Sequence, residues 1–277
     1  MTVHATIAPP LQSTASGISF LRRAGRAGSH SLVLLHGIGS NASSFLSVMT
    51  ALPASIDVLA WNAPGYAASL PLADKSPSPR DYAAALLRLL DAIEFKQVVL
   101  CGHSLGALFA GSFAAHYPDR VAALALMSPT LGYRVKPGEP LPPTVQARID
   151  EIETVDLDTF AAKRAARLVF GPERKPQVLA AVRSAMTALN LAGYVQAVRA
   201  LGAGDLLADA AAITAPTVVA VGAEDVITPP ANARSLYAAL PRAVAFHEVA
   251  DAGHALPQED PATVAGMLTQ LMERIDG

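Results

Sequence analysis

Residues 97–106 read Gln-Val-Val-Leu-Cys-Gly-His-Ser-Leu-Gly. The first five residues form a short apolar run, which is typical of a strand buried on both faces of a parallel sheet. A helix is expected from about Leu105, so the segment predicts a strand, a tight turn and a helix in succession. On such a turn the backbone of Ser104 is strained and projects its hydroxyl out of the sheet, and the flanking glycines prevent clashes.

Similar apolar runs recur along the chain and alternate with helical patterns. Strands are predicted at residues 18–22, 31–35, 56–61, 97–101, 121–127, 217–221 and 243–249. A clear helix start lies between two of them, where Ser78 can cap a helix that has Pro79 at its first position. Strands and helices in alternation indicate right-handed βαβ units. The fold class predicted is therefore α/β, with a mostly parallel central sheet flanked by helices.

One long segment interrupts this alternation. Residues 133–143 are rich in Pro and Gly, and residues 144–207 show only helical patterns, with Asp156 expected to cap one of the helices. We predict an inserted helical cap at 132–207, a core at 17–131 and 208–277, and a flexible N-terminal arm at 1–16. The insertion should lie at the carboxyl ends of the strands, where open α/β sheets bind ligands.

Composition excludes several classes of protein. The 277 residues carry 21 Lys+Arg and 23 Asp+Glu, a net charge of −2, which argues against a nucleic-acid partner. A single cysteine, Cys101, cannot form an internal disulfide. The sequence shows no signal-peptide pattern and no membrane-length apolar run, so we expect no membrane partner and a cytoplasmic protein. It also lacks metal-ligand spacing and nucleotide-binding motifs, so we predict no metal and no cofactor.

A serine hydroxyl needs a base, and the base needs an acid to orient it. His254 follows the strand predicted to end near Val249, and Asp225 follows the strand at 217–221. Both should therefore share the carboxyl edge of the sheet with Ser104. We expect Asp225 to be the acid in preference to Glu224 or Asp251, because Asp251 would have to fold back from the histidine's own loop. His103 is expected to pack rather than to act as a base.

Four motifs in this order resemble those of the α/β-hydrolase superfamily over residues 18–275. They are His36-Gly37-Ile38-Gly39, Gly102-His103-Ser104-Leu105-Gly106, Gly222-Ala223-Glu224-Asp225 and Gly253-His254. The resemblance implies the α/β-hydrolase fold and a triad in the chain order Ser, Asp, His. It further implies that the backbone N–H groups of Ile38 and Leu105 form the oxyanion hole, and that His36 holds its loop.

The resemblance leads us to expect a cofactor-independent serine hydrolase that cleaves a small carboxylic ester or lactone through an acyl-enzyme. Carbon–carbon or amide hydrolysis by the same triad is one alternative. Ala255 disfavours carbon–carbon hydrolysis, because the similar meta-cleavage-product hydrolases, which cleave carbon–carbon bonds, typically have Trp after the histidine. A non-catalytic protein that binds a small ligand is the alternative from another class.

The inserted helices are expected to form a lid whose apolar underside selects a small, mostly uncharged substrate. The candidate substrate-binding residues are Tyr133, Phe160, Met186 and Tyr194. Arginines of the insertion that could instead bind a substrate carboxylate are Arg164, Arg167, Arg183 and Arg199. The identity of the substrate and the oligomeric state are left open.

Overall fold

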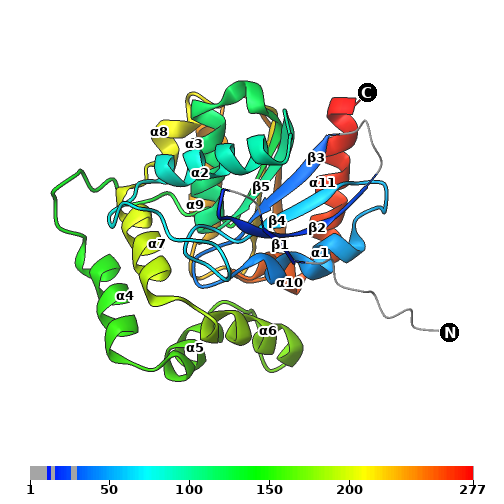
Figure 1. The fold of residues 1–277 in the computed structure, drawn as a ribbon. Coiled ribbons are helices and arrows are strands. Elements are labelled where there is room, and N and C mark those ends of the chain that lie inside the picture. Colours follow the sequence, from blue (N-terminus) through cyan, green and yellow to red (C-terminus); the bar gives the residue numbers. More distant parts are fainter. Residues whose placement is uncertain (1–10, 14–15, 26–29, 277) are drawn as a thin grey trace.

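The computed structural model describes residues 11–13, 16–25 and 30–276, and their strands form one eight-stranded sheet (Figure 1). The strands are β1 (Leu11–Ser13), β2 (Ser19–Arg23), β3 (Ser31–Leu35), β4 (Val58–Trp61), β5 (Val98–His103), β6 (Val121–Met127), β7 (Thr217–Gly222) and β8 (Ala243–Val249). Their order is β1-β2-β4-β3-β5-β6-β7-β8. β1 and β2 are antiparallel to their neighbours, and the other pairs are parallel. The predicted α/β class with a mostly parallel sheet is confirmed.

Helices connect most of the strands. They are η1 (Ala42–Phe45), α1 (Leu46–Ala51), α2 (Pro79–Ala92), α3 (Leu105–His116), η2 (Pro118–Arg120), α4 (Pro143–Thr154), α5 (Leu157–Ala165), α6 (Pro176–Thr187), α7 (Leu191–Ala203), α8 (Leu206–Ala210), α9 (Pro230–Ala239), α10 (Leu256–Glu259) and α11 (Pro261–Asp276). α2 begins as expected, because the Asp81 carboxylate accepts the Ser78 backbone N–H at 2.7 Å and so caps the helix start.

The observed strands lie where apolar runs predicted them, with ends that differ by at most two residues. β5 continues to His103 because Gly102 and His103 still pair with β6. The short edge strand β1 was not predicted and corrects part of the expected N-terminal arm, since three residues give no periodic signal. The rest of that arm, apart from Ser16, lies outside the described residues.

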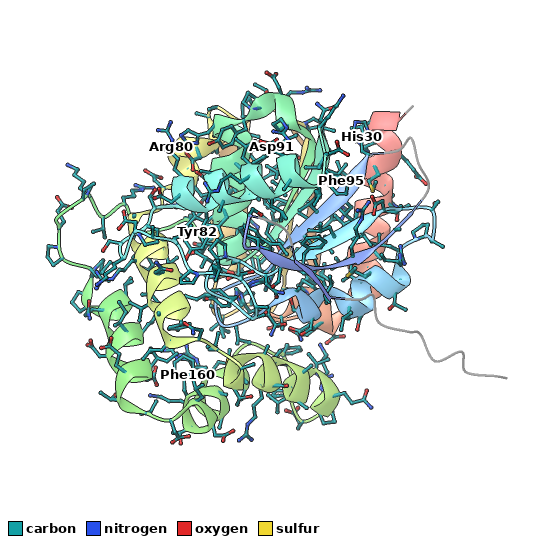
Figure 2. All side chains as sticks on the ribbon, in the orientation of Figure 1. His30, Arg80, Tyr82, Asp91, Phe95 and Phe160 are labelled. Atoms are coloured by element: carbon teal, nitrogen blue, oxygen red, sulfur yellow. The ribbon has the colours of Figure 1, made fainter. Side chains whose placement is uncertain are left out.

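The apolar runs arise because both faces of the sheet are covered. Side chains alternate along a strand, so Val33 and Leu35 face one layer while Leu32 and Leu34 face the other. Helices α2, α3 and α9 cover the first face, and α1 and α11 cover the second (Figure 1). Tyr82 of α2, labelled in Figure 2, is fully buried and its ring stacks on Phe109 of α3 at 4.1 Å between centroids.

Helices α4–α7 interrupt the alternation between β6 and β7. Figure 1 shows α4–α6 set apart from the helices that cover the sheet, whereas α7 packs against α2. Asp156 caps α5 as expected, because its carboxylate accepts the Thr159 backbone N–H at 2.9 Å. α8 returns to the core and packs against α3 and α9. No single helix within the described residues is long and apolar enough to cross a membrane; α6 and α7 reach that composition only jointly and meet at a bend of 103°.

Candidate active site

Ser104 occupies the turn between β5 and α3 with left-handed backbone geometry, φ 55° and ψ −114°. Such a conformation is costly for a residue other than glycine and persists only where the surroundings impose it. The two glycines of the motif are required by space: a Cβ on Gly102 would lie 2.2 Å from the Gly106 carbonyl oxygen. A Cβ on Gly106 would lie 2.1 Å from the Leu35 carbonyl oxygen. The turn therefore explains both glycines and places the serine hydroxyl at the carboxyl edge of the sheet.

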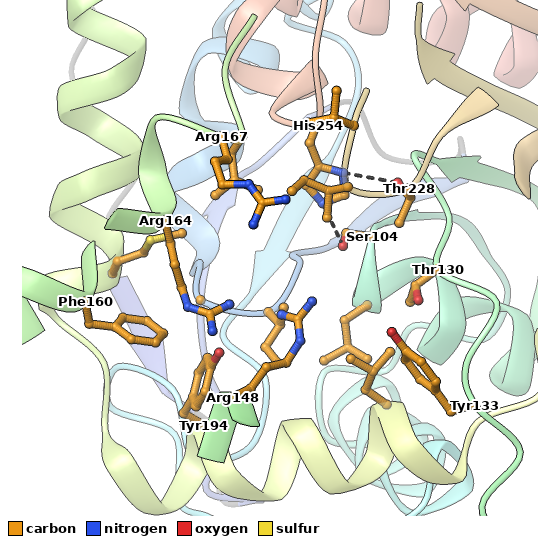
Figure 3. Close-up of a pocket in the computed structure, with 18 residues that line it drawn as sticks. Ser104, Thr130, Tyr133, Arg148, Phe160, Arg164, Arg167, Tyr194, Thr228 and His254 are labelled. Carbon is orange, nitrogen blue, oxygen red and sulfur yellow. Dashed lines mark hydrogen bonds between the residues drawn. The ribbon is translucent and has the colours of Figure 1, made fainter. Parts of the chain in front are cut away.

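The structure brings the three predicted triad residues into one chain of hydrogen bonds. His254 Nε2 lies 2.9 Å from Ser104 Oγ, and His254 Nδ1 lies 2.9 Å from Asp225 Oδ2. The residues follow the ends of β5, β7 and β8; β7 and β8 are neighbours in the sheet, and β6 alone separates β5 from β7. All three side chains are buried, and Figure 3 shows His254 directly above Ser104. The two alternative acids, Glu224 and Asp251, are exposed.

The Asp225 carboxylate is held in its ionised form. Its Oδ1 accepts the backbone N–H groups of Ile227 and Thr228, each at 2.9 Å. Burial alone would raise the pKa of Asp225, but interaction with His254 and these hydrogen bonds outweigh it and lower the pKa to about 2. The side chain that faces His254 Nδ1 is therefore a carboxylate at neutral pH, and it accepts the Nδ1–H of the imidazole.

Thr228 belongs to the same network, although no sequence pattern singled it out. Its Oγ1 lies 2.9 Å from Asp225 Oδ2, 2.9 Å from the Ser128 carbonyl oxygen and 3.1 Å from His254 Nδ1. The hydroxyl has one proton to donate, so it donates to one of the two oxygens while its lone pairs face the imidazole. The local signal for this turn is Asp225 itself, because an Asp side chain readily accepts the backbone N–H groups two and three residues further along the chain.

His103 packs against the catalytic candidate His254, as expected. Its Nε2 donates to the His254 carbonyl oxygen at 2.7 Å, and the ring is buried. Burial, with the nearby His254 adding to it, lowers the pKa of His103 to about 3. The neutral ring thus anchors the backbone of the histidine loop at the point where the imidazole must face Ser104.

A neutral buried His103 makes folding sensitive to acid. In the unfolded chain the pKa is about 6.5, so between pH 6.5 and 3 the unfolded state binds a proton that the folded state excludes. The contribution of the neutral His103 ring to the free energy of unfolding is present above pH 6.5 and decreases as the pH falls from 6.5 toward 3. We expect the wild type to lose about 2 kcal/mol more unfolding free energy between pH 7 and pH 5 than His103→Gln does. Urea unfolding at both pH values measures this, and equal losses in the two proteins contradict it.

His36 has a comparable structural part in the loop after β3. Its Nδ1 donates to the Gly37 carbonyl oxygen at 2.9 Å, and its Nε2 accepts the Ala63 backbone N–H at 3.0 Å. Burial lowers the pKa of His36 to about 4, in keeping with a neutral ring. A Cβ on Gly37 would lie 3.0 Å from Ser104 Cβ, so this loop passes directly beside the serine. These contacts of His36 and Gly37 hold the loop that carries Ile38 next to Ser104.

A cavity of about 190 Å³ opens in front of Ser104 and His254. Its lining includes the two residues predicted for the oxyanion hole and the four substrate-binding candidates at 132–207 other than arginines: Ile38, Leu105, Tyr133, Phe160, Met186 and Tyr194. Tyr133 is 43% exposed and Val226, which also lines the cavity, is 66% exposed, so these two lie at its mouth. Inserted helices and sheet loops thus enclose one small cavity around the serine.

The charge of the cavity differs from the apolar underside that the sequence predicted for the inserted helices. Three arginines line it, namely Arg148, Arg164 and Arg167. Arg148 had not been singled out, because the helical pattern of α4 does not show which face meets the cavity. The other two candidate arginines, Arg183 and Arg199, lie outside the lining. Within the part of the chain that the structure describes, no group of three or more His, Cys, Asp or Glu could hold a metal ion.

Comparisons with known proteins agree with this architecture. The sequence model of the alpha/beta hydrolase fold family matches residues 30–261. The chain is 31% identical to the pimeloyl-[acyl-carrier protein] methyl ester esterase of Aromatoleum aromaticum, over 81% of this chain and 90% of that one. Identity to the protein of the same name from Chromobacterium violaceum is 29%, over 81% and 87% of the two chains.

A solved structure with a similar fold is the enol-lactonase of Burkholderia xenovorans. It superimposes with a TM-score of 0.82 at 23% sequence identity and covers 95% of this chain and all of the other. The family match extends from the end of the loop before β3 to the start of α11, and so includes every part of the site described above. The chain belongs to the alpha/beta hydrolase fold family and is a hydrolase.

Proposed function

We propose that this protein is a cofactor-independent serine hydrolase that cleaves a small carboxylic ester or lactone through an acyl-enzyme. The observation that carries the proposal is the buried hydrogen-bond chain from Asp225 through His254 to Ser104, which ends in an enclosed cavity. A serine that is hydrogen-bonded to a histidine, itself oriented by a carboxylate, is the arrangement that activates a hydroxyl as a nucleophile.

In the proposed reaction, Ser104 Oγ attacks the carbonyl carbon and its proton passes to His254 Nε2. The tetrahedral intermediate collapses when the carbon–oxygen bond to the alcohol breaks, and the imidazolium returns the proton to the departing oxygen. Water then attacks the acyl-enzyme by the same steps and releases the acid. Asp225 stabilises the imidazolium and keeps the neutral ring in the tautomer with its proton on Nδ1, which leaves Nε2 free to accept.

We assign the oxyanion hole to the backbone N–H groups of Ile38 and Leu105. Leu105 is the first residue of α3, so its N–H has no carbonyl partner within the helix. Ile38 lies in the loop that the His36 contacts position beside Ser104. Both residues line the cavity together with the serine. Donors placed there stabilise the tetrahedral oxyanion more than the ground-state carbonyl, which is what lowers the barrier.

We further propose that residues 132–207 act as the cap over a core made of residues 17–131 and 208–277. Helices α4–α7 supply Phe160, Met186 and Tyr194 to the cavity, and the Phe160 and Tyr194 rings meet edge to face at 5.5 Å. A cap in this place excludes water from the reacting carbonyl and so strengthens the oxyanion hydrogen bonds.

The similar proteins support ester hydrolysis over the alternatives. Two relatives are methyl ester esterases, and the similar solved structure is a lactonase. Ala255 still argues against the carbon–carbon hydrolases of the family, and amide hydrolysis shares the whole mechanism except for its leaving group. A non-catalytic binding protein would have no need for the strained Ser104 backbone.

Covalent labelling and a substrate panel test the proposal together. A fluorophosphonate probe should label wild-type protein at Ser104 and should not label Ser104→Ala, because the probe requires an activated serine. The same sample is then assayed on short alkyl esters, lactones, the matching amides and a vinylogous diketone. Turnover of esters or lactones above the others supports the proposal, while turnover of the diketone alone assigns carbon–carbon hydrolysis. Absence of labelling and of all turnover contradicts a hydrolytic role for the triad.

Met186 offers a test of the cap. Met186→Ala should enlarge the cavity and shift the chain-length preference toward longer acyl chains, by about tenfold in the ratio of kcat/KM values for hexanoyl and acetyl esters. Fluorophosphonate labelling should stay nearly unchanged, because Met186 is no part of the triad. Leu189→Ala is the matched control, since Leu189 is buried in the same insertion but lies outside the lining. An equal shift in both variants would assign the effect to loosened packing.

A further inference from the structure

The positive charge in the cavity has no counterpart in the proposed ester chemistry. Figure 3 shows the guanidinium groups of Arg148, Arg164 and Arg167 directed into the space in front of Ser104 and His254. The lining contains no Asp or Glu. An uncharged ester would make no use of three cations, and the protein as a whole has a net charge of −2, so the cluster does not follow from composition.

One of the three arginines is neutralised within the protein. Arg164 Nε donates to Glu151 Oε2 at 2.9 Å, its Nη2 contacts the same oxygen, and its guanidinium lies 4.8 Å from the centre of the Phe160 ring. Glu151 also pairs with Lys163 at 2.7 Å. These contacts fix the direction of the Arg164 side chain and neutralise its charge within the protein.

The other two arginines have no such partner. Within the described residues, neither Arg148 nor Arg167 forms an ion pair. The one further acid close to them, Asp150, accepts a hydrogen bond from Gln146 at 2.8 Å. Arg148 hydrogen-bonds the neutral Tyr194 side chain. A guanidinium carries more N–H donors than this contact uses, so both arginines face the cavity with donors to spare. Arginine presents these donors in a planar fork that matches a carboxylate or a phosphate.

A second cavity strengthens the case that these side chains form a site. About 510 Å³ of space lies between α4 and α5 and is lined by polar residues that include Lys163. The two cavities have Arg148, Arg164 and Arg167 in common and no other lining residue. The arginines thus stand between the space in front of the serine and this outer space, where a negatively charged group can approach them.

We propose that the cavity binds substrates that carry an anionic group remote from the scissile ester, and that Arg148 and Arg167 bind this group while Arg164 is held in place by Glu151. The inference rests on the proposed ester hydrolysis and names its substrate class: short esters or lactones with a carboxylate or phosphate at the far end. A cavity of about 190 Å³ limits the linking chain to a few carbons. Apolar residues of the same lining, such as Phe160 and Met186, suit that chain.

Matched pairs of substrates test the proposal. Monomethyl esters of dicarboxylic acids are compared with methyl esters of alkanoic acids of equal length, at constant ionic strength. The wild type should prefer the anionic member by about tenfold to hundredfold in kcat/KM. Arg167→Met and Arg148→Met should each lower the ratio of anionic to neutral kcat/KM by about tenfold. Arg167 is exposed, so its replacement does not endanger folding.

Arg183→Met is the matched control, because Arg183 is an exposed arginine of the same insertion outside both linings. It should leave the preference unchanged. The proposal is overturned if the wild type shows no preference, if the preference survives in the Arg148→Met/Arg167→Met double variant, or if Arg183→Met abolishes it equally.

Binding to Ser104→Ala separates this proposal from the proposed function. Ligand-observed NMR compares hexanoate, pentyl phosphate and hexanamide on that variant, with and without Arg167→Met. Selective binding of either anion, lost with Arg167→Met, supports the anion site even if no ester is turned over, and the better anion identifies the chemistry. Turnover of esters together with equal binding of hexanamide leaves the proposed function standing and overturns the anion site.

Discussion

Ser104→Ala should lower kcat for every accepted substrate by about 10³- to 10⁶-fold, because Ser104 is the lining residue whose hydroxyl is hydrogen-bonded to His254 Nε2. His254→Ala should cost a similar factor. The double variant should be little worse than either single one, since Ser104 and His254 act in one step through a 2.9 Å hydrogen bond and removal of either abolishes it. Steady-state kinetics with purified protein provides the measurement.

The fold should survive the serine change. Alanine can occupy the same turn, and the glycines that permit it, Gly102 and Gly106, remain. Thermal unfolding of Ser104→Ala close to that of the wild type is therefore the control that a loss of rate reflects chemistry. Near-normal turnover by Ser104→Ala on the wild-type substrates would remove Ser104 from the mechanism and refute the proposed acyl-enzyme.

Asp225→Asn should lower kcat by about 10⁴-fold, because the amide can donate to His254 Nδ1 and so favours the tautomer that blocks Nε2 as a base. The wild-type carboxylate accepts from the Nδ1–H at 2.9 Å and is ionised at neutral pH, with its pKa lowered to about 2. The asparagine is nearly the same size, so packing around it changes little. Steady-state kcat values of Asp225→Asn and of the wild type are measured at one pH with the same ester.

Asp251→Asn is the matched control for the acid. Asp251 lies in the loop of His254 itself, but its side chain is exposed, and only its carbonyl oxygen is engaged, by Lys175. We expect its replacement to change kcat by less than about threefold, the scale of a surface substitution. A larger loss for Asp251→Asn than for Asp225→Asn would assign the acid to the histidine loop and would show that the hydrogen bond to Asp225 is not the one that matters in the reaction.

Much of the fold could be predicted because the relevant signals are local. A strand covered on both faces must be apolar along nearly its whole length, so β3 and β6 were predicted with the bounds observed. The helix start at Ser78 follows from capping chemistry within four residues. The short edge strand β1 was missed, because pairing with β2 rather than periodicity creates it.

The sequence by itself determined the turn at Ser104, since only glycine fits at Gly102 and Gly106. It also brought His254 and Asp225 to the same edge, because parallel strands end on one side of a sheet. Only the tertiary structure decided that Thr228 joins the network and that Arg148 and Arg167 line the cavity in front of the serine, with no carboxylate partner among the described residues. These contacts join segments that are distant in the chain or depend on how the helices of the insertion rotate about their axes. Helical periodicity states which residues share a face, but only packing decides what that face meets.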